Sequence, residues 1–253
     1  MTGSAAGRVL RQTLGGLLDL VYPPQCLICG AGGEPVVCDV CSDSFAPIPE
    51  PVCARCGRPV GGGSVPCLLC AAVAEAGREW GFDTARAAAI YAGPLRHGIH
   101  RLKFHGAEPL GEPLGAFLAN RLVADGLIAA EIGDGIDAVA FVPMDPWRER
   151  RRGYNQARLL AEPVAALLGV PLLPGALRRA RRAPAQVGLT RNERLRNLTS
   201  EAFSVRDAAV VAGHHLLLID DVFTTGTTAS ACAAALKAAG ARRVTVATLA
   251  AGG

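Results

Sequence analysis

The sequence predicts an α/β protein, a parallel β-sheet wrapped by helices, with a small metal-binding domain in front of it. The sheet is predicted because short apolar runs recur after residue 80, each separated from the next by a longer segment with helical periodicity. The metal-binding domain is predicted because eight of the nine cysteines lie within the first 70 residues as four Cys-x-x-Cys pairs. We place the boundary between a domain of residues 1–80 and a domain of residues 81–253.

Length and composition indicate a globular protein with a sizeable core. The chain has 253 residues, half of them apolar, and a net charge of +4. No apolar stretch reaches the ~18 residues that a membrane span needs, and charges interrupt the amino-terminal segment where a signal peptide would be continuous. We therefore expect a cytoplasmic protein without a membrane span, and the sequence leaves its oligomeric state open.

The spacing of the cysteines is typical of metal ligands. Two thiolates three residues apart on a tight turn can bind one ion at about 2.3 Å, and a second pair completes the tetrahedral shell that zinc prefers. Local pairing predicts two four-cysteine sites, within residues 26–41 and 53–70, with the ligands Cys26, Cys29, Cys38, Cys41, Cys53, Cys56, Cys67 and Cys70. A closed shell of four thiolates leaves no open position, so we expect structural zinc. Interleaved pairing, an iron–sulfur cluster, or one occupied site beside a degenerate one are the alternatives.

The apolar runs of the second domain are interpreted as buried strands, and the segments between them as helices. The predicted strands are residues 85–91, 137–143, 214–220 and 242–250. The predicted helices are residues 110–127, 155–168 and 228–239, the last of which ends at Gly240, a helix-stop signal. In such sheets the ligand lies beyond the carboxyl ends of the strands, where loops and helix amino termini converge.

One stretch at such a strand end, LLLIDDVFTTGTT at residues 216–228, combines acids with a hydroxyl-rich loop. The predicted strand ends at Asp220 and Asp221, residues 222–227 form the loop, and a helix follows. Amides at a helix start, together with threonine hydroxyls and the close approach that Gly226 permits, can hold a phosphate. The two acids would repel that phosphate, so they must serve vicinal hydroxyls or a hydrated Mg²⁺ nearby. A sugar phosphate satisfies both requirements.

The same stretch resembles the ribose-phosphate signature of type I phosphoribosyltransferases. The resemblance implies a Rossmann-like parallel sheet, in which the acidic pair binds the 2′- and 3′-hydroxyls of phosphoribosyl pyrophosphate and the Thr/Gly loop binds its 5′-phosphate. Carried over by position, the implied binding residues are Asp220, Asp221, Val222, Thr224, Thr225, Gly226, Thr227 and Thr228. Asp220 and Asp221 are then also the implied catalytic residues.

Nearly the whole chain is similar to the ComF family of competence-associated phosphoribosyltransferase-like proteins, including its longer members with a double zinc ribbon. The other marks of this similarity are PPQCLICG, LKFHG (102–106), VPMDPWRERRRGYNQA (142–157) and QVGLTRNERLRNLTSEAF (186–203). By order along the chain, residues 142–147 resemble a loop that grips the diphosphate, and residues 148–156 resemble part of a closing loop or of the acceptor surface. The implied candidates for the pyrophosphate or the acceptor are Pro143, Lys103, Arg150, Arg151 and Arg152. Asp145 stands where the family usually has proline, and would either add a Mg²⁺ contact or repel the diphosphate.

The resemblance implies Mg²⁺-dependent transfer of phosphoribosyl to a nitrogenous acceptor, linked to DNA uptake in natural transformation. The alternative is a non-catalytic protein of the same fold that handles single-stranded DNA with the competence machinery. Between Arg148 and Arg206, 13 arginines stand against four glutamates, so this segment should face an anion, although charge does not separate a phosphorylated metabolite from a nucleic acid. The aromatic residues best placed to stack on bases are Phe104, Trp147, Tyr154 and Phe203.

Overall fold

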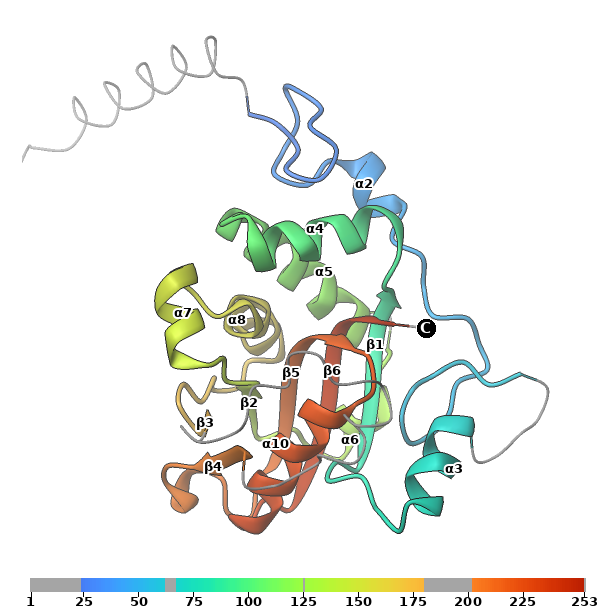
Figure 1. Cartoon of the computed structure of the whole chain (residues 1–253), viewed down its shortest axis with the longest axis vertical. Coiled ribbons are helices and arrows are strands. Elements are labelled where there is room, and N and C mark those ends of the chain that lie inside the picture. Colours follow the sequence, from blue (N-terminus) through green and yellow to red (C-terminus); the bar gives the residue numbers. More distant parts are fainter. Residues whose placement is uncertain (1–23, 62–66, 125, 180–201, 253) are drawn as a thin grey trace, which may run out of the picture.

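A computed structural model of the chain describes residues 24–61, 67–124, 126–179 and 202–252 (Figure 1). Its α-helices are α2 (Asp39–Asp43), α3 (Leu68–Glu75), α4 (Gly93–Phe104), α5 (Gly111–Val123), α6 (Ala129–Gly133), α7 (Pro146–Arg152), α8 (Gln156–Leu168) and α10 (Thr227–Ala238). Its strands are β1 (Thr84–Ile90), β2 (Ala138–Phe141), β3 (Leu177–Arg179), β4 (Phe203–Val205), β5 (His215–Phe223) and β6 (Arg243–Ala251), and two short 3₁₀ helices are η1 (Glu108–Leu110) and η3 (Ala208–Val210). Most of the motif at residues 186–203 lies outside the described residues.

Four strands form one parallel sheet in the order β1-β6-β5-β2. These are the four strands that the sequence predicts, so the expected α/β fold with a parallel sheet is confirmed. The inner strands β5 and β6 are each nine residues long and almost entirely buried, because helices cover both faces of the sheet. A long strand buried on both faces reads in sequence as a continuous apolar run, which is why these strands could be found.

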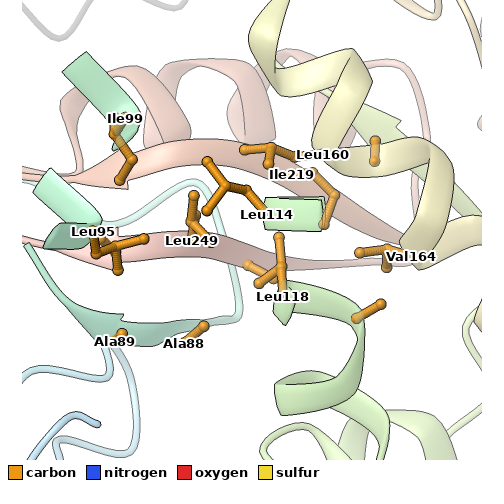
Figure 2. Close-up of a cluster of buried hydrophobic side chains, with 14 of the residues drawn as sticks. Ala88, Ala89, Leu95, Ile99, Leu114, Leu118, Leu160, Val164, Ile219 and Leu249 are labelled. Carbon is orange, nitrogen blue, oxygen red and sulfur yellow. The ribbon is translucent and has the colours of Figure 1, made fainter. Parts of the chain in front are cut away.

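Helices α4, α5 and α8 cover one face of the sheet, and α10 covers the other (Figure 1). Figure 2 shows how α4, α5 and α8 direct apolar side chains at the sheet. Ile219 and Leu249 of the sheet are covered by Leu95, Ile99, Leu114, Leu118, Leu160 and Val164. Full burial of such a side chain contributes about 1.5–3 kcal/mol, so this layer holds the sheet rigid beneath the candidate site. Within the described part of the chain, no helix has the length and apolar character to cross a membrane.

Among the features that the sequence pattern did not predict are helix α4, helix α7 and the antiparallel pair of β3 and β4. Helix α4 carries glycine and histidine inside it, and its buried stripe is narrow, since Leu95, Ile99 and Leu102 are the large side chains that it buries. Helix α7 buries no residue at all and therefore has no apolar face to detect.

The cysteine-rich segment packs on the sheet domain in two places. The segment with the first four cysteines, residues 26–41, is called the first ribbon, and the segment with the next four, residues 53–70, the second ribbon. The first ribbon packs Ile28 against Gly98 of α4, where an added Cβ would lie 3.0 Å from Ile28 Cδ1. The second ribbon lies at the open edge of the sheet, where the amide of Ala85 in β1 donates to the carbonyl of Arg55 at 2.8 Å. An uncovered edge strand invites pairing with other chains, so the second ribbon also protects the fold. A division of the chain at residue 80 stays a prediction.

Candidate functional site

The four cysteines of each predicted group come together as metal-binding clusters. In each cluster the sulfurs lie within 4.8 Å of one another, and the local pairing, not an interleaved one, is the one that the structure has. The Sγ–Sγ distances are 3.8 Å for Cys26–Cys41, 3.7 Å for Cys29–Cys38, 3.8 Å for Cys53–Cys70 and 3.4 Å for Cys56–Cys67. A tetrahedron with zinc–sulfur bonds of about 2.3 Å separates its sulfurs by about 3.8 Å, so the geometry fits a zinc ion in each site.

The predicted phosphate loop joins β5 to α10 at the carboxyl edge of the sheet. Strand β5 continues to Phe223, three residues beyond the acid at Asp220 where the sequence ended it, and α10 begins at Thr227. The loop is therefore shorter than expected and comprises residues 224–226. The acids lie inside the strand, where Asp220 pairs with Thr248 of β6 and the amide of Asp221 donates to Asp220 Oδ1 at 2.8 Å.

The loop surrounds a small hollow that suits a phosphate. Its volume is about 40 Å³, and its walls come from Asp220, Val222, Phe223, Thr224, Thr225, Gly226, Thr227, Thr228, Ala229 and Thr248. A single water needs roughly 10–15 Å³ by the same measure, so a group of a few heavy atoms fits. The first amides of a helix have no partner inside it and attract anions. Thr225 and Thr227 share a hydrogen bond of 2.7 Å between their hydroxyls, while Thr224 and Thr228 are exposed.

Gly226 is required by both the backbone and the packing of this loop. Its φ is +72°, and a Cβ added there would lie 2.6 Å from Phe223 Cζ and 2.9 Å from Trp80 Cζ3. No other residue type combines that backbone angle with so close an approach of two rings.

Gly226→Ala is therefore expected to destabilise the protein by roughly 1–3 kcal/mol more than a substitution that only strains the backbone. Gly213→Ala is the matched control, since Gly213 has a φ of +77° and open space around its Cβ position. Thermal unfolding of both variants measures the difference. Equal losses of stability would mean that the rings near Gly226 yield easily and do not define the loop.

Asp220 and Asp221 are consecutive residues of β5 and therefore face opposite sides of the sheet. Asp220 lines the hollow of the phosphate loop on the α10 side. Asp221 is buried on the other side, where its Oδ1 contacts Lys103 Nζ at 2.7 Å and its Oδ2 accepts from Gln156 Nε2 at 2.8 Å. One acid thus faces the hollow, and the other holds a cation and an amide side chain in place.

The environments of the two acids also set the charges of this site. Burial raises the pKa of Asp220 to about 7, the charge of Asp221 adds to the rise, and Lys103 opposes it. Burial lowers the pKa of Lys103, but the charges of Asp221 and Asp220 outweigh burial and raise it, so the ammonium group stays protonated. Near neutral pH the site can therefore gain or lose a proton at Asp220 while Lys103 remains a fixed cation.

Helix α7 explains the unusual acid at position 145. Asp145 is the N-cap of this helix, and its Oδ1 accepts from the amides of Trp147 at 3.1 Å and Arg148 at 3.2 Å. An acid at a helix start satisfies orphan amides and the helix dipole. The structure thus gives Asp145 a structural role that neither of the two sequence-based alternatives contained.

A basic, aromatic cleft lies between α4 and α7. Its volume is about 460 Å³, and it is lined by Lys103, Phe104, Gly106, Trp147, Arg148, Arg151 and Arg152. Phe104 and Trp147 are both 66% exposed, and guanidinium groups lie over both rings, Arg152 at 5.9 Å from the Phe104 centroid and Arg151 at 5.6 Å from that of Trp147. Of the predicted diphosphate or acceptor residues, Lys103, Arg151 and Arg152 line this cleft.

Two other candidates lie outside the lining of the cleft. Arg150 is exposed on α7, and Pro143 follows β2 at the carboxyl edge of the sheet. Sequence reasoning included Gln156 only as the last residue of the segment 148–156 and gave it no role of its own. In the structure Gln156 links the cleft to the acids, because it accepts from Arg152 and donates to Asp221. Its position in the RGYNQA stretch, directly after a run of arginines, was the available signal.

Two known domain families match the chain. Residues 17–74 match the double zinc ribbon domain, and residues 155–253 match the phosphoribosyl transferase domain.

Curated relatives extend the match. The DNA utilization protein YhgH of Escherichia coli is 31% identical over 185 residues, which are 71% of this chain and 77% of that protein. The protein of the same name from Salmonella typhi is 30% identical over the same share of each chain. Competence protein F of Haemophilus influenzae is 38% identical over 69 residues, 27% of this chain and 30% of that protein.

Two solved structures align with part of the chain. The glutamine phosphoribosylpyrophosphate amidotransferase of B. subtilis aligns with a TM-score of 0.40 at 20% identity, over 60% of this chain and 30% of that chain. An adenine phosphoribosyltransferase aligns with a TM-score of 0.31 at 22% identity, over 52% of this chain and 69% of that chain.

Proposed function

The chain belongs to the ComF family of proteins with a double zinc ribbon and a phosphoribosyltransferase domain, and from this premise we propose that it binds phosphoribosyl pyrophosphate with Mg²⁺. The observation that carries the proposal is the hollow at the β5–α10 turn, where helix amides and threonine hydroxyls adjoin the half-buried carboxyl of Asp220. A phosphate ester and a ribose hydroxyl are the two groups that these donors and this acceptor would bind.

In this proposal the 5′-phosphate occupies the hollow. Its oxygens accept from amides and hydroxyls of residues that line the hollow, namely Val222, Thr224, Thr225, Gly226, Thr227 and Thr228. Asp220 accepts from a ribose hydroxyl, and Asp221, which faces the other side of the sheet, keeps Lys103 aimed at the substrate. Since Asp220 has a pKa of about 7 and accepts best when ionised, binding should strengthen as the pH rises through neutrality.

The diphosphate of the substrate would lie toward the cations. Lys103 is held by Asp221 beside the acids, and Arg151 and Arg152 reach the adjoining cleft. Pro143 and Arg150 remain candidates at its border. Mg²⁺ fits this arrangement because the substrate itself supplies the oxygen ligands that the ion prefers, and when bound it would neutralise the diphosphate.

The reaction that such a site would support is phosphoribosyl transfer to a nitrogenous acceptor. The bond from the anomeric carbon to the diphosphate oxygen breaks, a bond from that carbon to nitrogen forms, and the acceptor's proton passes to solvent. The chain's own contribution is to orient the ribose and hold the leaving group, so no covalent nucleophile from the protein is required. We place this activity in the cytoplasm, where the eight ligand thiols stay reduced.

Thermal unfolding with and without phosphoribosyl pyrophosphate and Mg²⁺ tests the proposal. A ligand at 100 times its dissociation constant stabilises the native state by about 2.7 kcal/mol, which should raise the melting temperature by several degrees. The rise should disappear in Asp220→Asn and persist in Glu75→Gln, where Glu75 is an exposed acid on α3. Absence of any rise in the native protein would overturn the proposal.

A second candidate function is the handling of single-stranded DNA, in keeping with the names of the relatives. The observation that favours it is the α4–α7 cleft, since single strands bind where basic side chains meet exposed aromatic rings. Phosphates would contact the arginines, and bases would stack on Phe104 and Trp147.

Fluorescence anisotropy of a labelled oligothymidylate, measured across a salt series, tests this second candidate. Trp147→Leu should weaken binding by about 1–3 kcal/mol, and Arg151→Gln should lower the salt dependence. Arg158→Gln, which removes an exposed arginine paired with Glu162 on α8, should change neither. A flat salt dependence in the native protein would exclude phosphate-driven DNA binding.

A further inference from the structure

The second ribbon is in direct contact with the phosphate loop. Arg58, which lies two residues after Cys56 of the second metal site, donates through Nη2 to the carbonyl oxygen of Thr224. The first ribbon packs instead on α4, through Ile28 against Gly98. The second metal site is therefore linked to the β5–α10 loop, whereas the first is linked to α4.

Trp80 forms a second link between the same ribbon and the loop. Its Nε1 donates to the sulfur of Cys70, a ligand of the second site, at 3.3 Å. The other end of the ring abuts Gly226, where a Cβ would lie 2.9 Å from Trp80 Cζ3. The ring is 8% exposed and stacks on Phe82 at a centroid distance of 4.9 Å.

The chain around Trp80 is also fixed to the helix that starts at the loop. The amide of Gly81 donates to Ser230 Oγ of α10 at 2.9 Å. An added Cβ at Gly81 would lie 2.3 Å from the carbonyl oxygen of Ser230, so this backbone touches the helix directly. Arg55 of the ribbon donates to the carbonyl oxygen of Trp80 at 3.3 Å. Metal ligand, indole ring and helix start thus form one packed unit.

We propose that the second four-cysteine site positions the phosphate loop through Trp80 and Arg58, so that filling this site with zinc strengthens binding of a phosphate ester there. This inference deepens the proposed function and rests on it for the identity of the ligand. Without metal, the short segment around Cys53–Cys70 has too few apolar residues to hold its shape, and both contacts to the loop are released. A loop that is no longer held in its binding conformation must be ordered by the ligand, which weakens affinity.

Hydrogen–deuterium exchange of the zinc-loaded full chain tests the link without any phosphate ligand. Cys70→Ser, which removes a ligand of the second site, should speed exchange in residues 223–230 by about tenfold or more. Cys29→Ser, the matched control at the first site, should speed exchange in α4 and leave residues 223–230 unchanged. Trp80→Phe keeps an aromatic ring but loses the hydrogen bond to the Cys70 sulfur, and should speed exchange at the loop less than Trp80→Leu does. Equal exchange at the loop in Cys70→Ser and Cys29→Ser would overturn the inference.

The reverse effect gives a second readout, because coupling between two binding sites is reciprocal. Phosphoribosyl pyrophosphate with Mg²⁺ should raise the zinc affinity of the second site, measured by equilibrium competition with a chromophoric chelator, and leave the affinity of the first site unchanged. Cys29→Ser identifies which of the two affinities belongs to the first site. If the native protein shows no stabilisation by this ligand, the proposed function fails while the exchange experiment still decides the inference. If the ligand binds and the zinc affinity of both sites stays unchanged, the inference fails while the proposed function stands.

Discussion

Zinc removal is expected to lower the melting temperature of the protein by roughly 10 °C or more. Each structural zinc contributes binding free energy to folding, and at this chain length 1 kcal/mol corresponds to about 2–4 °C. Zinc removal should destabilise this protein more than it would if the ribbons made no contact with the sheet domain. The reason is that the second ribbon covers the open edge of β1 and part of the core around Trp80 and Phe82.

Calorimetry before and after treatment with a chelator measures this effect, and metal analysis of the purified protein gives the stoichiometry. Two zinc ions per chain and recovery of the melting temperature on adding zinc are the expected results. A chelator-treated protein that unfolds at the same temperature would show that the cysteine clusters do not hold the fold together. Iron in place of zinc would favour a cluster over the two tetrahedral sites.

The two neighbouring acids of β5 are expected to respond to substitution in opposite directions. Asp220 has a pKa raised to about 7, so between its unfolded value near 4 and this value the native state holds a proton that the unfolded chain has lost. This contribution to stability is present at low pH and is lost as the pH rises to 7. Asp220→Asn should therefore raise the melting temperature at pH 8, by about 2–4 °C for each kcal/mol, and remove the stabilisation by phosphoribosyl pyrophosphate.

Asp221→Asn should instead destabilise the protein, because it leaves the partly buried ammonium of Lys103 without its counter-ion. We expect a loss of about 1–3 kcal/mol, reduced from that of a fully buried pair because Lys103 is 23% exposed. Thermal unfolding of both variants between pH 5 and 8 distinguishes the acids. Similar losses of stability in both variants would mean that Asp220 is a structural acid like Asp221 and does not face a ligand site.

Features set by local pattern could be predicted from the sequence. The continuous apolar runs identified β5 and β6, and the Cys-x-x-Cys spacing identified both clusters with their pairing. The acids of the signature were placed at the correct strand. That strand extends to Phe223, three residues beyond the predicted end at Asp220, because Val222 and Phe223 pair with β6 and a loop of threonines and glycine gives no sharper boundary.

Features set by tertiary packing could not be predicted. Gly98 weakens the helical signal of α4, yet it packs closely against Ile28 of the first ribbon, where an added Cβ would lie 3.0 Å from Ile28 Cδ1. The opposite orientations of Asp220 and Asp221 follow from the strand continuing past them, and the contact of Trp80 with the loop joins residues 146 positions apart, from 80 to 226. No pattern within either segment contains that contact.

A structure of the protein crystallised with phosphoribosyl pyrophosphate and Mg²⁺ tests the central claim most directly. We predict the 5′-phosphate within about 3.2 Å of the amides at the start of α10, and a ribose hydroxyl at the same distance from the carboxylate of Asp220. A ligand bound elsewhere would contradict the account. So would a β5–α10 turn that stays closed and holds no ligand at a saturating concentration.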